Sequence, residues 1–190
     1  MFKQNGINKS LLSTENIVNS SDYENFAMQL LNRKDKGTNV IALTCDIKTS
    51  DITAIVCLNV GFNLKKHGNN VLVINMDTHN IAFNDLLESQ SNDDRVVSYG
   101  DIDVLLPQST DFTQNLSLED FKSKYSEYDF VILCVPSPKY ESNYLAVPKN
   151  TDFYLLVTKF FSSYFAANKC IDLIEAIDSK VLGSVYIKLK

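Results

Sequence analysis

The sequence predicts an α/β fold in which a mostly parallel sheet carries helices on both faces, so that the molecule has three layers. Short apolar runs without alternation, typical of strands covered on both faces, recur along the chain. Segments of helical length separate these runs, and strict alternation of strand and helix is typical of a parallel sheet. The length of 190 residues suits a single domain of this class.

The first predicted helix begins at a capping box formed by Ser21 and Glu24. There a hydroxyl and a carboxylate satisfy the first backbone N–H groups of the helix. We expect residues 1–20, rich in Asn and Ser, to form a flexible arm, and residues 21–190 to form one domain. Helices are predicted over 22–31, 52–66, 81–88, 117–125 and 163–177. Strands are predicted over 40–45, 71–74, 102–106, 130–135, 153–158 and 181–187. Gly68 is expected to end the second helix with a positive φ.

Charge and hydropathy exclude two classes of partner. The formal net charge is -5 and no run of Lys or Arg occurs, whereas nucleic-acid binding depends on clustered cations. No stretch reaches the roughly 20 apolar residues of a membrane span, and the first residues are too polar for a secretory signal. We therefore expect a cytoplasmic protein without a transmembrane segment that does not bind nucleic acid.

Parallel sheets bind ligands beyond the carboxyl ends of their strands, which directs attention to residues 46–51 after the first strand. A phosphate loop there would need glycine, but none of the six glycines falls between residues 40 and 60. The loop instead contains Asp46, Lys48, Thr49, Ser50 and Asp51. Its carboxylates would repel phosphate, so ATP and magnesium are not expected as cofactors. Alternatively, Ser50 or Asp51 caps the following helix, and Lys48 is a solvated charge.

Asp77 is the best single candidate for an active-site residue. It follows the second strand, where a carboxylate can position a metal or a water molecule. A structural role is the alternative, because Asp at a strand end commonly caps the next turn. His79 lies nearby, but no further ligands occur at the spacing that a zinc site requires, so no metal is expected.

Two cysteines, Cys45 and Cys134, end predicted strands that could lie side by side. They could approach one another as a redox pair. The other interpretation is two thiols packed in the core, which a reducing cytosol favours.

Six segments and one spaced pair of residues together resemble the P-loop ATPase domain of bacterial tyrosine kinases, the CpsD-like proteins of capsule and exopolysaccharide synthesis within the wider MinD/ParA family. The resemblance extends over residues 22–190. It is carried by Asn59 with Gly68 nine residues later, and by these segments: VIALTC, VLVINMD, IDVLLPQST, YDFVILCVPSP, TDFYLLV and VLGSVYI.

The phosphate-handling residues of that family do not carry over. Its Walker A glycines and lysine have no counterpart in DIKTSDITA, so the domain lacks a functional Walker A motif and residues 46–51 are a vestigial nucleotide loop. The family's second Walker motif is an apolar strand followed by Asp-x-Asp-x-Arg. This sequence has Asn75, Asp77 and His79 at those positions, so only Asp77 is kept. Cys134 stands in place of the Walker B aspartate, while Pro136 is kept.

The family's ring-assembly pattern is matched by Glu24 alone, because Ala27 and Leu30 occupy its arginine positions. Exposed aromatic residues offer another contact surface, and the candidates are Phe161, Tyr164 and Phe165. The alternative is that these aromatic residues belong to the core.

A kept framework with replaced phosphate-handling residues implies a catalytically inactive relative of the tyrosine kinases, a pseudokinase. Its expected role is a scaffold or regulator of exopolysaccharide or capsule synthesis and export. The resemblance implies a membrane polysaccharide co-polymerase, a related kinase or a second copy as partner, and peripheral association with the inner membrane. Two alternatives stay open. One is a MinD/ParA-like protein that localises a pilus or secretion machine, and the other is an ATPase or tyrosine kinase with a non-standard site.

Overall fold

The computed structural model describes residues 21–46, 51–77, 96–106, 117–139, 147, 151–159, 164–176 and 181–187. The helices are α2 (Ser21–Leu31), α3 (Asp51–Lys66), α5 (Leu118–Lys124) and α6 (Tyr164–Glu175). The strands are β1 (Asn39–Cys45), β2 (Val71–Asn75), β3 (Val96–Tyr99), β4 (Ile102–Leu105), β5 (Phe130–Cys134), β6 (Phe153–Lys159) and β7 (Val181–Ile187).

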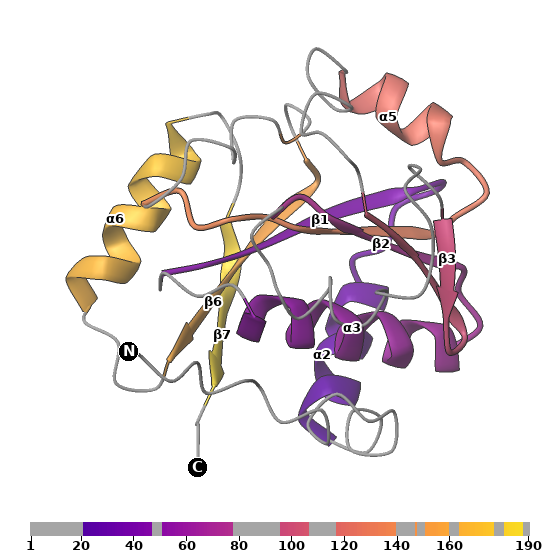
Figure 1. The fold of residues 1–190 in the computed structure, drawn as a ribbon, viewed down its shortest axis with the longest axis horizontal. Helices are drawn as coiled ribbons and strands as arrows, with labels where there is room; N and C mark the ends of the chain where they lie inside the picture. The colour runs from indigo at the N-terminus through magenta and orange to yellow at the C-terminus, as the bar shows by residue number, and fades with distance from the viewer. Residues whose placement is uncertain are drawn as a thin grey trace, which may run out of the picture.

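The described strands form one sheet in the order β3-β4-β2-β5-β1-β6-β7 (Figure 1). Neighbouring strands run parallel from β4 to β7, and β3 pairs antiparallel with β4 at one edge. Every residue of β1, β2 and β5 is buried, as expected for strands that are covered on both faces. This arrangement confirms the predicted α/β class.

Helices cover both faces of the sheet (Figure 1). On one face, α2 and α3 pack against alternate β1 residues such as Ile41 and Leu43. On the other face, Val40 and Ala42 share a core with α5 and α6. The three expected layers follow directly from this alternation of side chains along buried strands.

Most predicted elements are present with boundaries that differ by one or two residues. Gly68 has φ +80° after α3, as its predicted role at the helix end requires. Ser117 accepts a hydrogen bond from the Asp120 backbone N–H at 3.1 Å and caps α5. The arm at 1–20 and the predicted helix at 81–88 lie outside the described residues.

Strand β3 was not predicted. Its sequence, VVSY, is short, and its side chains are only partly buried, so it produces no continuous apolar run. The turn into β4 depends on Gly100, which has φ +60°. A Cβ atom at Gly100 would lie 2.8 Å from the Phe62 ring, so the close packing of this ring also requires a residue without a side chain.

Ionic contacts tie three loops together at the amino edge of the sheet. The Lys34 Nζ atom lies 2.6 Å from one Asp129 carboxylate oxygen, and the Asn70 backbone N–H donates to the other at 2.9 Å. Lys34 also donates to the Asn69 side-chain oxygen at 2.9 Å. The hydrogen bonds from Lys34 and Asn70 hold the pKa of Asp129 below its usual value.

This lowered pKa predicts a pH-dependent contribution to stability. A carboxylate whose pKa is lower when folded stabilises the protein above its unfolded pKa, and that contribution disappears as the pH falls through the folded value. We expect Asp129→Asn to lower the free energy of unfolding at pH 7 by about 0.5–1 kcal/mol, since the pair is partly exposed. Urea unfolding should show the difference from wild type shrinking below about pH 4 and in 1 M salt. An unchanged difference at low pH would contradict the ionic origin.

Candidate functional site

Parallel pairing brings the carboxyl ends of four strands to one edge of the sheet. In the ladder, Cys134 of β5 lies opposite Leu43 of β1 and Asn75 of β2. Cys45 of β1 lies opposite Val157 of β6. The residues that follow or end these strands are therefore neighbours, and this is the edge at which parallel sheets bind ligands.

Backbone contacts fix the segment after β5 at this edge. The Val135 backbone N–H donates to the Leu43 carbonyl at 2.8 Å, and the Thr44 hydroxyl donates to the Pro136 carbonyl at 2.9 Å. On the other side, the Met76 backbone N–H donates to the Cys134 carbonyl at 2.9 Å. The site is therefore built on rigid strand ends.

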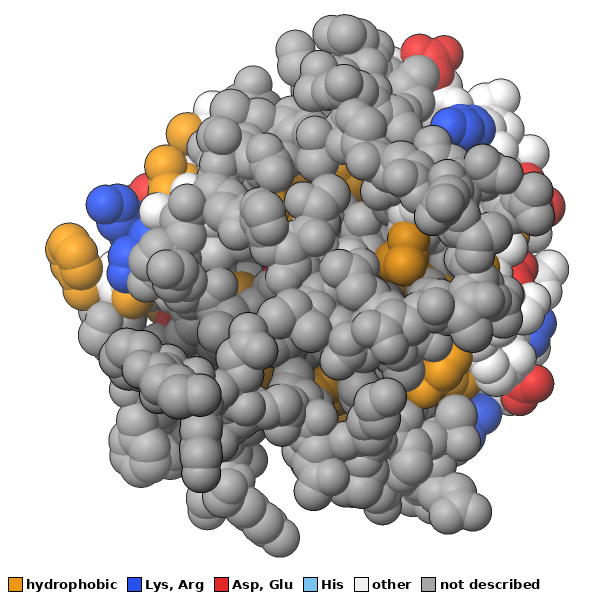
Figure 2. Space-filling view, viewed as in Figure 1, with side chains coloured by type: hydrophobic (Ala, Val, Ile, Leu, Met, Phe, Trp, Pro, Cys, Tyr) orange, Lys and Arg blue, Asp and Glu red, His pale blue; other side chains and the backbone are white. Residues whose placement is uncertain are grey.

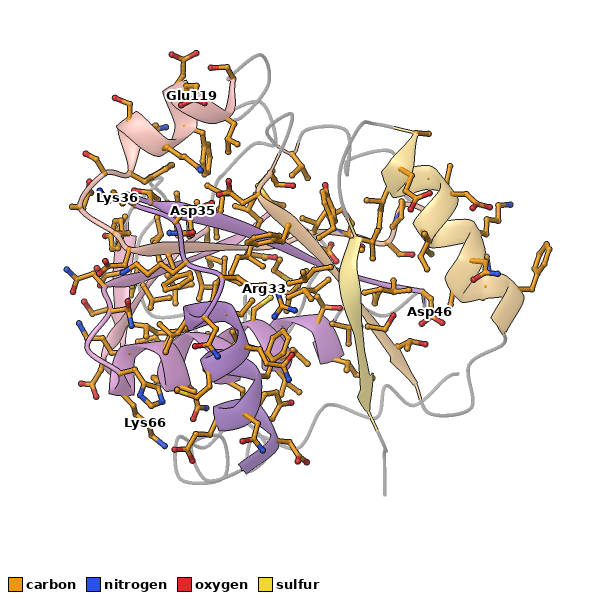
Figure 3. All side chains as sticks on the ribbon, turned by 180° about the vertical axis from the view of Figure 1, so that it is seen from behind. Arg33, Asp35, Lys36, Asp46, Lys66 and Glu119 are labelled. Carbon is orange, nitrogen blue, oxygen red and sulfur yellow. The ribbon has the colours of Figure 1, made fainter. Side chains whose placement is uncertain are left out.

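Asp46 is the first residue beyond β1 and is only 2% exposed. Figure 3 shows it at the end of β1 near α6, far from Asp35 and Lys36. The Thr158 hydroxyl donates to its carboxylate at 2.8 Å. The Cys170 thiol of α6 lies 3.9 Å from the neighbouring Cys45 carbonyl oxygen. Asp46 is thus built into the junction of β1, β6 and α6.

Asp77 is also buried, with 2% exposure. Its backbone N–H donates to the Asn75 side-chain oxygen at 3.1 Å, and the Asn75 amide donates back to the Asp77 carbonyl at 2.9 Å. These paired bonds hold the turn after β2. Asn75 therefore fixes the backbone that carries the Asp77 carboxylate, a supporting role that the sequence analysis did not assign.

Cys134 is fully buried at the end of β5. Burial raises the pKa of its thiol well above the usual value, and a hydrogen-bonding contact with Cys57 of α3 raises it further. Cys45 lies close enough to add to this effect. Cys45 and Cys134 belong to the same buried core cluster, and neither forms a disulfide. A thiol buried in a packed core, as that of Cys134 is, is unreactive.

Helix α3 points its amino end at the same edge. It begins at Asp51, directly after the segment 47–50, and its first-turn residues Thr53 and Ala54 are fully buried. The N–H groups at a helix start have no partner within the helix and attract anions. Lys48, Thr49 and Ser50 lie outside the described residues, as does the side chain of Asp51.

The predicted contact residues are distributed over two helices. Glu24 is exposed on α2, whereas Ala27 and Leu30 on the same helix are buried against the core. Phe165 on α6 is 79% exposed. Phe161 lies outside the described residues, and the side chain of Tyr164 is not described.

The charges on the visible face are mixed. Figure 2 shows Lys or Arg and Asp or Glu side chains interspersed along the rim beside α5 and β3.

Within the part of the chain that the structure describes, no helix has the length and apolar character needed to cross a bilayer.

Several solved structures are similar to this chain. The chimerical protein CapA2B2 is 19% identical, with a TM-score of 0.68 over 93% of this chain and 87% of that one. The kinase domain of the Escherichia coli tyrosine kinase ETK is 14% identical, with a TM-score of 0.67 over 85% of this chain and 71% of that one. The VpsO kinase domain is 16% identical, with a TM-score of 0.63 over 96% of this chain and 98% of that one.

No protein-family model matches the sequence, and no curated protein does either. At these identities the structural likeness shows the fold, which is that of the P-loop NTPase-like kinase domains and related ATPases. The resemblance that the sequence motifs indicated is confirmed at this level.

The expectation that ATP and magnesium are not cofactors is contradicted. Cobyrinic acid a,c-diamide synthase from Mycobacterium smegmatis, 13% identical with a TM-score of 0.58 over 78% of this chain and 74% of that one, has been solved with bound ADP and magnesium. A nucleotide-binding protein from Archaeoglobus fulgidus, similar at a TM-score of 0.57, is in complex with ADP. Phosphates at such sites are bound partly by backbone N–H groups, which any residue except proline supplies. A loop without glycine therefore does not exclude a nucleotide.

The Thr158–Asp46 hydrogen bond can be tested by unfolding. Thr158→Val keeps the side-chain shape but removes the donor to a buried carboxylate, so we expect the free energy of unfolding to fall by about 1–3 kcal/mol. Thr158→Ser, which keeps a hydroxyl, should lose less. Urea titration followed by circular dichroism measures both. No loss in Thr158→Val would contradict a stabilising role of this hydrogen bond.

Proposed function

We propose that this chain is a catalytically inactive relative of the bacterial tyrosine kinases that acts as a scaffold or regulator of exopolysaccharide or capsule synthesis and export. In this proposal the chain does not transfer a phosphoryl group, but it can bind a nucleotide, and this binding would regulate it. It places the protein in the cytoplasm at the inner membrane, in contact with a membrane polysaccharide co-polymerase or a related kinase.

The observation that carries the proposal is the buried, neutral Cys134 at the end of β5. P-loop enzymes hold their magnesium ion partly by an aspartate of the Walker B strand, and this ion neutralises the charge that develops on the transferred phosphoryl group. One unit charge at 4 Å contributes about 4 kcal/mol at an effective dielectric constant of 20. Replacing a carboxylate by a neutral thiol would therefore slow transfer by about 10³-fold.

Asp46 supports the same conclusion. Its carboxylate is held at the start of the segment where a phosphate loop would begin, and the bond from Thr158 fixes it there. A fixed negative charge beside phosphate opposes the charge that builds up during transfer. The described edge therefore has a thiol at the end of β5 and a buried aspartate after β1.

The scaffold role is supported by the division of α2 into two faces. Ala27 and Leu30 pack inside the molecule, so this face of the helix is used for the chain's own core. Phe165 on α6 is the large apolar side chain with the greatest exposure among the described residues. An exposed aromatic ring is a common anchor in protein interfaces.

Catalytic inactivity is tested with the full chain and magnesium ATP. We expect neither phosphate release nor phosphotyrosine above the background of an Asp77→Asn variant, with nucleotide binding measured separately by calorimetry. Binding without turnover supports the proposal. Turnover that is lost in Asp77→Asn would overturn it and favour an enzyme with a non-standard site.

The partner is tested by measuring binding to the purified cytoplasmic segment of a polysaccharide co-polymerase. We expect Phe165→Ala to weaken binding at least tenfold, which is the size of effect at an interface anchor. Met28→Ala is the matched control, because Met28 is a 41% exposed apolar residue on α2. No binding by wild type, together with binding to a pilus or secretion component, would favour a localising protein instead.

A further inference from the structure

Strand β7 forms one edge of the sheet, and among the described residues only β6 pairs with it. The ladder has an irregularity where Tyr154 and Leu155 pair with Val181 and Gly183. From Gly183 to Ile187 the pairing is regular. A regular edge strand presents unpaired N–H and C=O groups and is a template for a further strand.

The sequence of β7, VLGSVYI, has no charged residue and no proline, two devices that protect many edge strands from pairing. The irregularity lies at the start of β7, and the segment from Gly183 to Ile187 is regular. The opposite edge, β3, is protected in another way, because it is only four residues long. Strand β7 is therefore the edge that can accept another strand.

Gly183 lies at the irregularity of the β6–β7 ladder, as is common for glycine inside a strand. It has no positive φ, and a Cβ atom there would meet no atom within 4 Å. The space beside Gly183 therefore leaves room for a further strand to approach β7.

Both apolar layers of the molecule extend to this edge. Val181 packs against the core that contains α5 and α6, and Leu182 packs against the core that contains α2 and α3, yet both are only partly buried. A single peptide strand would extend the sheet without covering these two layers. A second copy of the chain would bring its own helices to both faces and cover them.

We propose that β7 pairs antiparallel with β7 of a second copy, so that the sheet continues across a two-fold axis. An isologous contact of this kind places the same residues on both sides. Because β7 is uncharged, no like charges meet in this pairing. Exposed Ser184 lies near the middle of the regular segment, and the two copies of Ser184 come close to the axis.

The test uses charge at Ser184, with the full chain and without nucleotide or partner. We expect wild type to sediment as a dimer at about 100 μM. Ser184→Lys and Ser184→Asp should each weaken the dimer at least tenfold, because each places like charges near the axis. An equimolar mixture of the two variants should restore dimers, now with opposite charges. Met28→Lys, an equal change of charge on α2, should leave the dimer intact.

A monomeric wild type at this concentration would overturn the proposal, as would a dimer that neither Ser184 variant weakens. Far-ultraviolet circular dichroism confirms that each variant is folded. Failure here is distinct from failure of the proposed function, since sedimentation measures self-association and neither phosphoryl transfer nor co-polymerase binding.

Discussion

The structure depends on the double pairing of β1. All seven of its residues are buried, and it pairs in parallel with β5 on one side and β6 on the other. A parallel strand without exposed backbone has no freedom to slip, because a shift of one residue would exchange its two faces. The Val40 backbone N–H donates to the Asp152 carboxylate at 2.7 Å, which also fixes the amino end of β1 against β6.

This constraint determines the chemistry at the carboxyl edge. Because β1 sets the positions of its neighbours, Asp46, Cys134 and Thr158 come together from segments that are distant in sequence. Burial raises the pKa of the Cys134 thiol, and the Thr158 hydroxyl donates a hydrogen bond to the buried Asp46 side chain.

Much of this architecture could be predicted from sequence, and the reasons are local. Apolar runs such as 130–135 are long enough to identify buried strands, and Gly68 and Ser117 mark helix ends with their own chemistry. Strand β3 has no such signal, because a short, half-exposed edge strand carries neither an apolar run nor clear alternation.

The site was harder to predict than the fold. Asp46, Asp77 and Cys134 could be singled out by their places after strands. The pairing of Asp46 with Thr158 and of Asn75 with the Asp77 backbone depends on contacts that no sequence pattern marks. The expectation that nucleotide does not bind rested on the missing glycines and on the loop carboxylates, and a similar structure with bound ADP and magnesium contradicts it. Backbone N–H groups can bind phosphate in a loop without glycine.

The four buried thiols have a consequence for how this protein can be followed in solution. All four cysteines of the chain are shielded from solvent, and three of them, Cys45, Cys57 and Cys134, share one core between the sheet and α3. A thiol reagent can reach this core only when α3 separates from the sheet or the whole molecule unfolds. The rate at which Cys45, Cys57 and Cys134 are modified therefore reports how often α3 separates from the sheet. A ligand that fastens α3 to the strand ends would slow this modification in proportion to its occupancy.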